Sequence, residues 1–428
     1  MKRIFFLALI VILFSILASQ SKKIYRKLPY DVRLILKKTL SWSNDYQKYS
    51  VFYKNYKDFP ETALINLDFS KIRLLHVTNR LDGGGKAVGY VEIYNDNIII
   101  VSGYGKFSYI NTKNITKKSK QVEIKTNLEN IIKDDNFFLK RSPSLFEDIS
   151  PDDLLVFNGD LYMSYSKKLG FNCYNTSIIK AKIDLTNLIF EDFFSYKDCV
   201  VLDKSKRGFF NSQKNGGRMS IIKHEEENKL LLTTGTFGDV QTSQDDNSFL
   251  GKVLLIDLKN RNGIVYAKGL RNPQGLVVVN KGEIITSSHG PIGGDELNNI
   301  KFKQNYGWPI ASYGTSYSDK IIYKKNHAQN GFVEPIYSFV PAVGVSQLIE
   351  VNKDFNILWG NNILLTSLKG ESIFRLTMDE DYTRIISKER IIVNERIRDI
   401  IYDNKTKSFY LLLEDSGSLG ILKNKDYG

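Results

Sequence analysis

Cysteine and histidine are scarce in this sequence, with two and four copies among 428 residues. Cys173 and Cys199 are too few for a disulfide-rich scaffold or a cysteine zinc site. The stretch between them reads as outer strands of a β-sheet. Two interpretations of the pair stay open: a disulfide if the protein is exported to an oxidising compartment, or two buried thiols.

Long apolar runs are also missing, except near the N-terminus. Residues 4–18 are apolar apart from Ser15, follow the basic Lys2 and Arg3, and fall short of the roughly 20 residues of a spanning helix. We therefore expect residues 1–21 to be a signal peptide or a membrane anchor, and the protein to be periplasmic or otherwise exported. With 42% hydrophobic and 25% charged residues, the chain is neither disordered nor a polytopic membrane protein.

The net charge of +13 is concentrated at the N-terminus. Residues 1–57 contain twelve basic and two acidic residues, a balance of +10, and leave +3 for the rest of the chain. A nucleic-acid-binding face is therefore not expected. Residues 22–59 are expected to form a basic, partly helical segment. It either contacts an anionic membrane surface through residues 1–42 or packs as a solvated helix on the main domain.

One pattern occurs six times: an apolar strand, a polar turn, a second apolar strand, and then glycine. The copies end at Gly105, Gly170, Gly235, Gly290, Gly370 and Gly417. Their mean spacing of about 62 residues is room for about four strands, which is one propeller blade. The fold class is therefore all-β, with a six-bladed β-propeller over residues 60–428. A long β-sandwich or two β-domains are the alternatives.

Potential ligand-binding residues gather between Gly269 and Pro309. Arg271 and Asn272 directly precede a predicted channel-lining strand, where a guanidinium and an amide can face a central ligand. Gly290 and Pro291 follow the next strand, and backbone carbonyls there suit a hard cation such as Ca²⁺. Asp295 and Glu296 add carboxylate oxygens.

Five motifs resemble one known family. GLRNPQGL, HGPIGGDE, NYGWP, SLKGESIFRL and ERIRDI together are similar to the soluble quinoprotein glucose and aldose sugar dehydrogenases, the glucose/sorbosone dehydrogenase family. The resemblance extends from about Gly216 to the C-terminus. It implies a six-bladed propeller that uses pyrroloquinoline quinone and Ca²⁺ to oxidise a sugar or related alcohol.

The resemblance also implies roles for particular residues. Lys369, Arg396 and Arg398, with Arg271 and Asn272, would bind the tricarboxylate cofactor. The carbonyls of Gly290 and Pro291 would hold the Ca²⁺ that polarises the quinone. Glu296 and the Tyr306 carbonyl would belong to a second, structural Ca²⁺ site. A quinone or cytochrome would accept the electrons.

One position departs from the family pattern. The family places its general base, a histidine, four residues before the Arg of a motif like H-x-G-G-R, and this chain has Lys214-Asn215-Gly216-Gly217-Arg218 there. To act as a base near neutral pH, a lysine needs a pKa of about 7 in place of its ordinary value of about 10.4. Burial beside Arg271 would lower it. Alternatively, Lys214 is a structural ammonium paired with Asp239.

Two functional hypotheses follow for Lys214 and Arg271. In the first, the protein is a dehydrogenase in which Arg271 stabilises developing negative charge and Lys214 or water takes the proton. In the second, it is a degenerate propeller that binds quinone or carbohydrate without turnover. A lactonase-like hydrolase on the same fold is a further rival, which would need several inward-facing carboxylates around one Ca²⁺.

Overall fold

The computed structural model describes residues 46–51, 65–77, 80, 87–113, 115, 120–138, 149–202, 210–317 and 322–425. The predicted signal or anchor (residues 1–21) and most of the basic segment (22–59) lie outside this range. Residues 46–51 of that segment form strand β1, which pairs with residues 67–72, so the sheet structure begins earlier than the predicted boundary at residue 60. None of the helices among the described residues combines the length and apolarity needed to span a bilayer.

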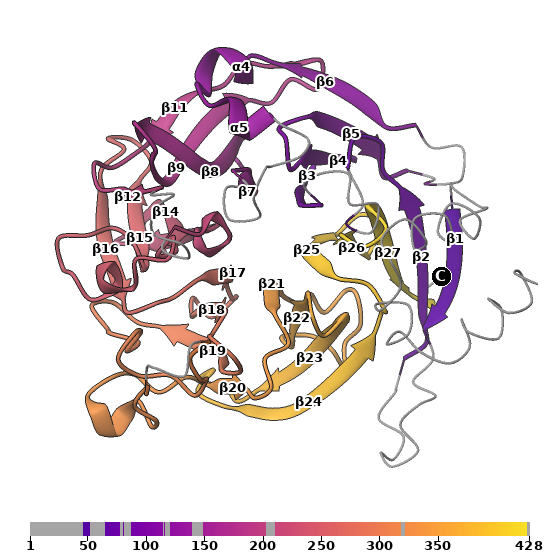
Figure 1. Ribbon diagram of the computed structural model, residues 1–428. Helices are drawn as coiled ribbons and strands as arrows, with labels where there is room; N and C mark the ends of the chain where they lie inside the picture. Colours follow the sequence, from indigo (N-terminus) through magenta and orange to yellow (C-terminus); the bar gives the residue numbers. More distant parts are fainter. Residues whose placement is uncertain are drawn as a thin grey trace, which may run out of the picture. The chain divides into compact units, whose positions relative to one another are not determined.

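Six sheets, antiparallel apart from one short parallel pairing, are arranged radially around a common centre (Figure 1). The first strand of each sheet lies innermost and contacts the first strands of the two neighbouring sheets, which closes the ring. The six predicted hairpins are the two inner strands of these six sheets. The six-bladed β-propeller is therefore confirmed, and the sandwich and two-domain alternatives are wrong.

Blades 1 to 3 follow one another along the chain. Blade 1 contains β3 (Gly89–Tyr94), β4 (Asn97–Ser102), β5 (Phe107–Asn111), β6 (Val122–Thr126) and β10 (Asn187–Leu188). Blade 2 contains β7 (Pro151–Phe157), β8 (Asp160–Gly170), β9 (Cys173–Lys182), β11 (Glu191–Phe194) and β12 (Val200–Val201). Blade 3 contains β13 (Gly216–His224), β14 (Glu227–Thr234), β15 (Lys252–Asp257) and β16 (Gly263–Lys268).

Blades 4 to 6 complete the ring. Blade 4 contains β17 (Pro273–Val278), β18 (Ile284–Ser288), β19 (Asp295–Ile300) and β20 (Tyr337–Phe339). Blade 5 contains β21 (Val345–Glu350), β22 (Ile363–Ser367), β23 (Ser372–Met378) and β24 (Ile385–Ile392). Blade 6 contains β25 (Ile397–Asp403), β26 (Ser408–Leu413), β27 (Ser418–Asn424), β2 (Leu67–Arg73) and β1 (Tyr46–Val51).

Short helices occupy the connections. They are α4 (Leu128–Ile131), α5 (Asp135–Phe138) and the 3₁₀ turns η3 (Ser212–Lys214), η4 (Val240–Ser243) and η5 (Ala328–Asn330). The ring is closed by β2, which pairs with β27 from Leu67 opposite Asn424 to Arg73 opposite Ser418. This pairing joins the two ends of the propeller in one sheet.

The second strand of each blade explains the apolar runs in the sequence. Ile99, Leu231, Ile285, Leu364 and Leu411 are fully buried on such strands. A central strand covered on both faces by neighbouring blades needs apolar side chains on both faces. These strands therefore read as continuous runs rather than as an alternating pattern.

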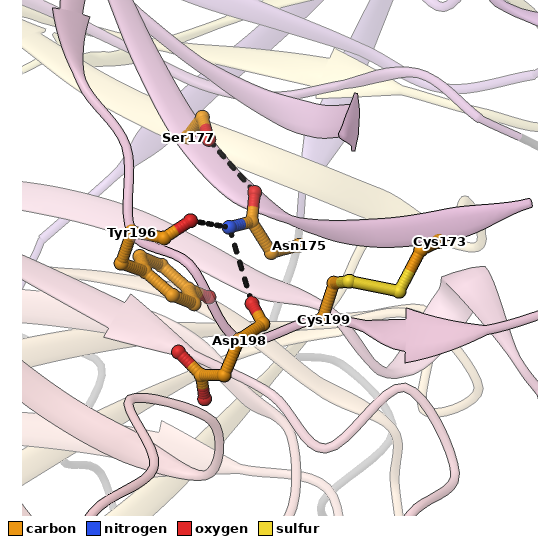
Figure 2. The surroundings of a disulfide bond; sticks show 6 residues. All are labelled: Cys173, Asn175, Ser177, Tyr196, Asp198 and Cys199. Atoms are coloured by element: carbon orange, nitrogen blue, oxygen red, sulfur yellow. Dashed lines mark hydrogen bonds between the residues drawn. A yellow bond between two sulfur atoms is a disulfide. The ribbon is translucent and has the colours of Figure 1, made fainter. Parts of the chain in front are cut away.

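Blade 2 carries a disulfide between Cys173 and Cys199, with Cα atoms 5.5 Å apart (Figure 2). The bond ties the start of β9 to the segment before β12. Beside it, the Asn175 side-chain amide donates to the carbonyls of Tyr196 at 2.8 Å and Asp198 at 3.3 Å. The disulfide interpretation is thus confirmed over the free thiols, and amide hydrogen bonds hold the same loop independently.

Candidate functional site

A cavity of about 290 Å³ opens at the end of the channel where the first strands begin. Its volume is at the lower end of the roughly 300–1,000 Å³ of small-molecule sites. The lining comes from all six blades and mixes cations, carboxyls and amides. It consists of Arg80, Ala87, Val88, Tyr90, Ser150, Asp152, Ser212, Gln213, Asn215, Gln274, His289, Leu368, Arg396, Arg398 and Glu414.

Bulges in the first strands bring several of these side chains to the cavity. The register with the second strand shifts between Pro151 and Asp153 in β7, between Pro273 and Gly275 in β17, and between Ile397 and Asp399 in β25. The residues skipped by these shifts are Asp152, Gln274 and Arg398, and each lines the cavity. Because a bulge re-aims a side chain, three blades present equivalent positions to one site.

Arg396 and Arg398 form the cationic wall. The Nε atoms of Arg396 and Arg398 lie 2.9 Å and 2.6 Å from the two carboxylate oxygens of Glu414, which is buried. These two arginines lower the pKa of Glu414 against the opposing effect of its burial. Arg80 also lines the cavity, so three guanidinium groups share the lining with the two carboxyls of Glu414 and Asp152, and cationic side chains outnumber acidic ones. The predicted pair is therefore brought together at the site.

Arg271 and Asn272 lie behind the cavity wall. Arg271 is 8% exposed, donates from Nη1 to the His289 carbonyl at 3.0 Å, and stacks over Trp308. The Asn272 amide donates to the Gln213 carbonyl at 2.9 Å. Both residues thus support cavity-lining neighbours, His289 and Gln213, and neither is itself part of the lining.

Lys214 ends the short turn η3, between the cavity-lining Gln213 and Asn215. Burial, and secondarily the charge of Arg271, lower the pKa of Lys214 to about 8. The direction and both causes match the prediction. Among the described residues no ion pair joins Lys214 to Asp239, so the paired-ammonium alternative is wrong for this structure. The Lys214 side chain does not belong to the cavity lining.

Lys369 is exposed, in a bend between β22 and β23. Its neighbour Leu368 lines the cavity, whereas Lys369 does not. The carried-over role of Lys369 in cofactor binding therefore stays a prediction.

The Gly290–Pro291 loop is fixed by one buried carboxylate. Asp295 accepts from the Gly290 amide at 3.0 Å and from the amides of Gly344 and Val345 at 2.6 and 3.2 Å. Backbone donors thus occupy three of the acceptor positions of Asp295, and its contribution of carboxylate oxygens to a cation stays a prediction. The carbonyls of Gly290 and Pro291 accept no hydrogen bond from any described residue. They are available to a hard cation.

Glu296 and Tyr306 both belong to blade 4. The Glu296 carboxylate accepts from Asn298 at 3.3 Å and lies 3.7 Å from Nε2 of His327. The ring nitrogens of His327 are buried, and the described part of the chain offers them no hydrogen-bond partner. Tyr306 is buried, and its hydroxyl donates to the Asn299 carbonyl at 2.6 Å. Within the described residues, no group of three or more His, Cys, Asp or Glu side chains is arranged to hold a metal ion.

Several cavity residues were missed at the sequence level: Arg80, Asp152, Gln274 and Glu414. Asp152 carried a signal, because two adjacent acids, Asp152 and Asp153, begin an otherwise apolar strand. Glu414 follows the last residue of β26, where the hairpin pattern places functional residues. Arg80 lies in a region without a recognisable motif.

The fold and the site define a six-bladed propeller with a cationic, small-molecule-sized cavity at one end of its channel. The sequence model described as Glucose / Sorbosone dehydrogenase matches residues 119–422, which is most of the chain. The protein belongs to this family, and the resemblance seen in its motifs is confirmed.

Curated relatives match about half of the chain. Aldose sugar dehydrogenase YliI of Escherichia coli is 28% identical over 221 residues, which cover 48% of this chain and 58% of the relative. Quinoprotein glucose dehydrogenase B of Acinetobacter calcoaceticus is 28% identical over 242 residues, which cover 41% of this chain and 50% of the relative. The chain thus spans little more than half the length of these relatives.

Solved structures share the fold. The soluble aldose sugar dehydrogenase of Escherichia coli in its apo form has a TM-score of 0.63 at 18% identity, covering 84% of this chain and all of that one. The PQQ-bound aldose sugar dehydrogenase of Streptomyces coelicolor has a TM-score of 0.55 at 18% identity, covering 83% of this chain and 98% of that one. At this identity the likeness shows the fold alone.

Proposed function

We propose that this protein is a pyrroloquinoline quinone- and Ca²⁺-dependent dehydrogenase that oxidises a sugar or related alcohol by hydride transfer to the quinone. The observation that carries the proposal is the cationic cavity at the channel end, built by Arg80, Arg396 and Arg398 in a chain of the glucose/sorbosone dehydrogenase family. The name of one relative, a quinoprotein glucose dehydrogenase, and that of the PQQ-bound structural neighbour support the choice of cofactor.

The charge of the cavity lining suits a polyanionic cofactor. Pyrroloquinoline quinone carries three carboxylates, and planar guanidinium groups bind carboxylates through paired N–H donors. Among the described residues, the Arg396 side chain bonds Glu414 and the Arg398 side chain bonds Glu414 and Gln274, so each of the five-donor guanidinium groups keeps N–H groups for a ligand. The cofactor would supply the two-electron oxidant. Lys369 and Asn272 remain further candidate ligands.

The Ca²⁺ proposal rests on backbone oxygens. The carbonyls of Gly290 and Pro291 lie beside cavity-lining His289 and accept no hydrogen bond from described residues. A cation held there would act as a Lewis acid on the cofactor. Glu296 and the Tyr306 carbonyl are proposed as a separate structural Ca²⁺ site.

Export to the periplasm is part of the proposal, with residues 1–21 as a cleaved signal or a retained anchor and residues 1–42 as the membrane contact. The Cys173–Cys199 disulfide supports an oxidising compartment. Electrons would leave to a quinone or cytochrome. Fractionation of cells and N-terminal sequencing of the mature protein test both parts of this assignment.

The activity is tested by dye reduction. Purified protein is loaded with pyrroloquinoline quinone and Ca²⁺ and assayed against a panel of aldoses and alcohols. Turnover that requires the cofactor supports the dehydrogenase. Tight cofactor binding without turnover on any substrate would instead favour the degenerate binding protein, which the lysine at position 214 makes the chief rival.

A further inference from the structure

We propose that Asp152 is the catalytic residue that takes the hydroxyl proton of the substrate. It would replace the family's general-base histidine, at whose position this chain has Lys214. The proposal rests on the dehydrogenase function above. Its basis is the contrast between two adjacent aspartates at the start of β7, one of which is fully engaged in the fold while the other faces the cavity.

Asp153 is the engaged member of the pair. Its Oδ1 lies 2.8 Å from Nη1 of Arg218, and its Oδ2 accepts from the Met219 amide at 2.8 Å. Asp153 is absent from the cavity lining. Its carboxylate therefore has a structural role in the channel.

Asp152 is the cavity-facing member. It is 2% exposed and lines the cavity, because the β7 bulge separates its direction from that of Asp153. Its Oδ1 accepts from the Asn215 amide at 2.5 Å, and its Oδ2 lies 3.4 Å from the Ser166 hydroxyl. No ion pair to Asp152 exists among the described residues. A carboxylate has about four acceptor positions, so two uncharged partners leave capacity for a substrate hydroxyl.

The Lys-Asn-Gly-Gly-Arg motif is built around this carboxylate. Asn215 is held by its carbonyl, which accepts from Thr176 at 2.8 Å and from the Gly235 amide at 2.7 Å, and its side chain then fixes Asp152. Gly217 has a φ of +102°, and a Cβ there would lie 2.3 Å from the Asp152 Cβ. The glycine is thus required for Asp152 to occupy its place.

The electrostatic surroundings suit a proton acceptor. Burial, with a smaller effect of the neighbouring Asp153 charge, raises the pKa of Asp152 well above its ordinary range, while Asn215, Ser166 and Arg218 act in the opposite direction. A carboxyl with a raised pKa is a better base near neutral pH than an ordinary aspartate. Burial raises the pKa of Tyr90, which also lines the cavity from the neighbouring strand β3.

The proton and electron balance is complete. Oxidation of the substrate alcohol breaks its O–H and C–H bonds as the carbonyl forms. A bound quinone would be the oxidant that accepts the hydride with its electron pair, and the proton would go to the Asp152 carboxylate. Lys214 is less suited to this step, because its side chain does not line the cavity.

The test compares Asp152→Asn with Asp192→Asn, an exposed carboxyl on β11 of the same blade. Asp152→Asn should lower kcat about 10²- to 10⁴-fold, the usual contribution of a general base, with KM changed less than threefold. Its affinity for pyrroloquinoline quinone, measured by fluorescence titration, should stay within about threefold of wild type. Asp192→Asn should match wild type in all three quantities.

Chemical rescue separates a base from a structural residue. In Asp152→Ala, added formate should raise kcat at least tenfold, and the rise should increase with the formate concentration. In wild type, kcat should rise with pH as Asp152 loses its proton. Lys214→Met should keep this rise, and Asp152→Asn should lose it. The proposal is overturned if Asp152→Asn keeps its kcat and pH profile, if cofactor affinity falls in step with kcat, or if Lys214→Met alone removes the pH dependence. Failure of the wild type to turn over any substrate would overturn both this proposal and the proposed function.

Discussion

Arg218 on blade 3 and Asp399 on blade 6 form an ion pair across the central channel, with Nη1 and Oδ1 2.8 Å apart. The same guanidinium also pairs with Asp153 of blade 2 and donates to the carbonyls of Gln274 in blade 4 and Arg398 in blade 6. It lies 4.8 Å from the Tyr90 ring of blade 1. One arginine therefore connects five of the six blades beneath the candidate site.

Replacing Arg218 should destabilise the whole propeller. In Arg218→Met the buried carboxylates of Asp153 and Asp399 lose their shared cation, and breaking such a buried pair typically costs about 3–5 kcal/mol. Urea unfolding of the purified variant measures the loss. Arg384→Met is the control, since Arg384 is 79% exposed and its loss should change stability by less than about 0.5 kcal/mol. Equal stability of the two variants would contradict a central role for Arg218.

The disulfide should contribute a separable stabilisation. Cys173 and Cys199 are 26 positions apart, and closing a loop of that length in the unfolded chain corresponds to about 3–4 kcal/mol. We expect the double Cys→Ser variant to fold, because the Asn175 hydrogen bonds hold the same loop. Its melting temperature should equal that of reduced wild type. A variant as stable as the oxidised protein would show that the bond contributes nothing.

Arg396 tests the cofactor site. Arg396→Gln should weaken pyrroloquinoline quinone binding about 10- to 150-fold, equivalent to the roughly 1.5–3 kcal/mol of a charge-assisted hydrogen bond. The fold should survive, since Glu414 keeps Arg398 as its partner. Arg261→Gln, 44% exposed and paired with Glu191, serves as the control. Unchanged affinity in Arg396→Gln would remove Arg396 from the site.

The stability of Asp152→Asn relative to wild type should depend on pH. The native pKa of Asp152 is raised, so the native state keeps a proton that the unfolded chain loses above about pH 4. The contribution of this proton to the free energy of unfolding of wild type is therefore largest at low pH and falls as the pH rises toward the native pKa of Asp152. Asp152→Asn lacks it, so the variant should gain stability relative to wild type as the pH rises above about 4. Denaturant titrations at several pH values measure the difference, and an opposite trend would show that the carboxyl is held ionised.

Features that depend on residues close together in the chain could be predicted from the sequence. Short sequence patterns mark the hairpin turns, so the six blades could be counted. One example is Asn158-Gly159 between β7 and β8, where the φ values are 52° and 78°. Pairing of β2 with β27 joins segments more than 340 residues apart, and no local pattern specifies such a partner. The closing strands were consequently not assigned to blade 6.

The site was predicted less completely for a related reason. Arg396 and Arg398 belong to a recognisable motif, and both reach the cavity. Asp152 does so only because a bulge re-aims it, whereas Arg271 donates to the His289 carbonyl and is not part of the cavity lining. Such offsets of one residue depend on register between strands, which periodicity alone cannot resolve.

The most direct test of the proposed function is a titration of the purified full-length protein with pyrroloquinoline quinone, with Ca²⁺ present and after its removal by a chelator. Tryptophan fluorescence or calorimetry gives the affinity and stoichiometry. We predict saturable binding of one cofactor per chain that weakens when Ca²⁺ is removed. No saturable binding in the presence of Ca²⁺ would contradict the assignment of this cavity as a quinone site.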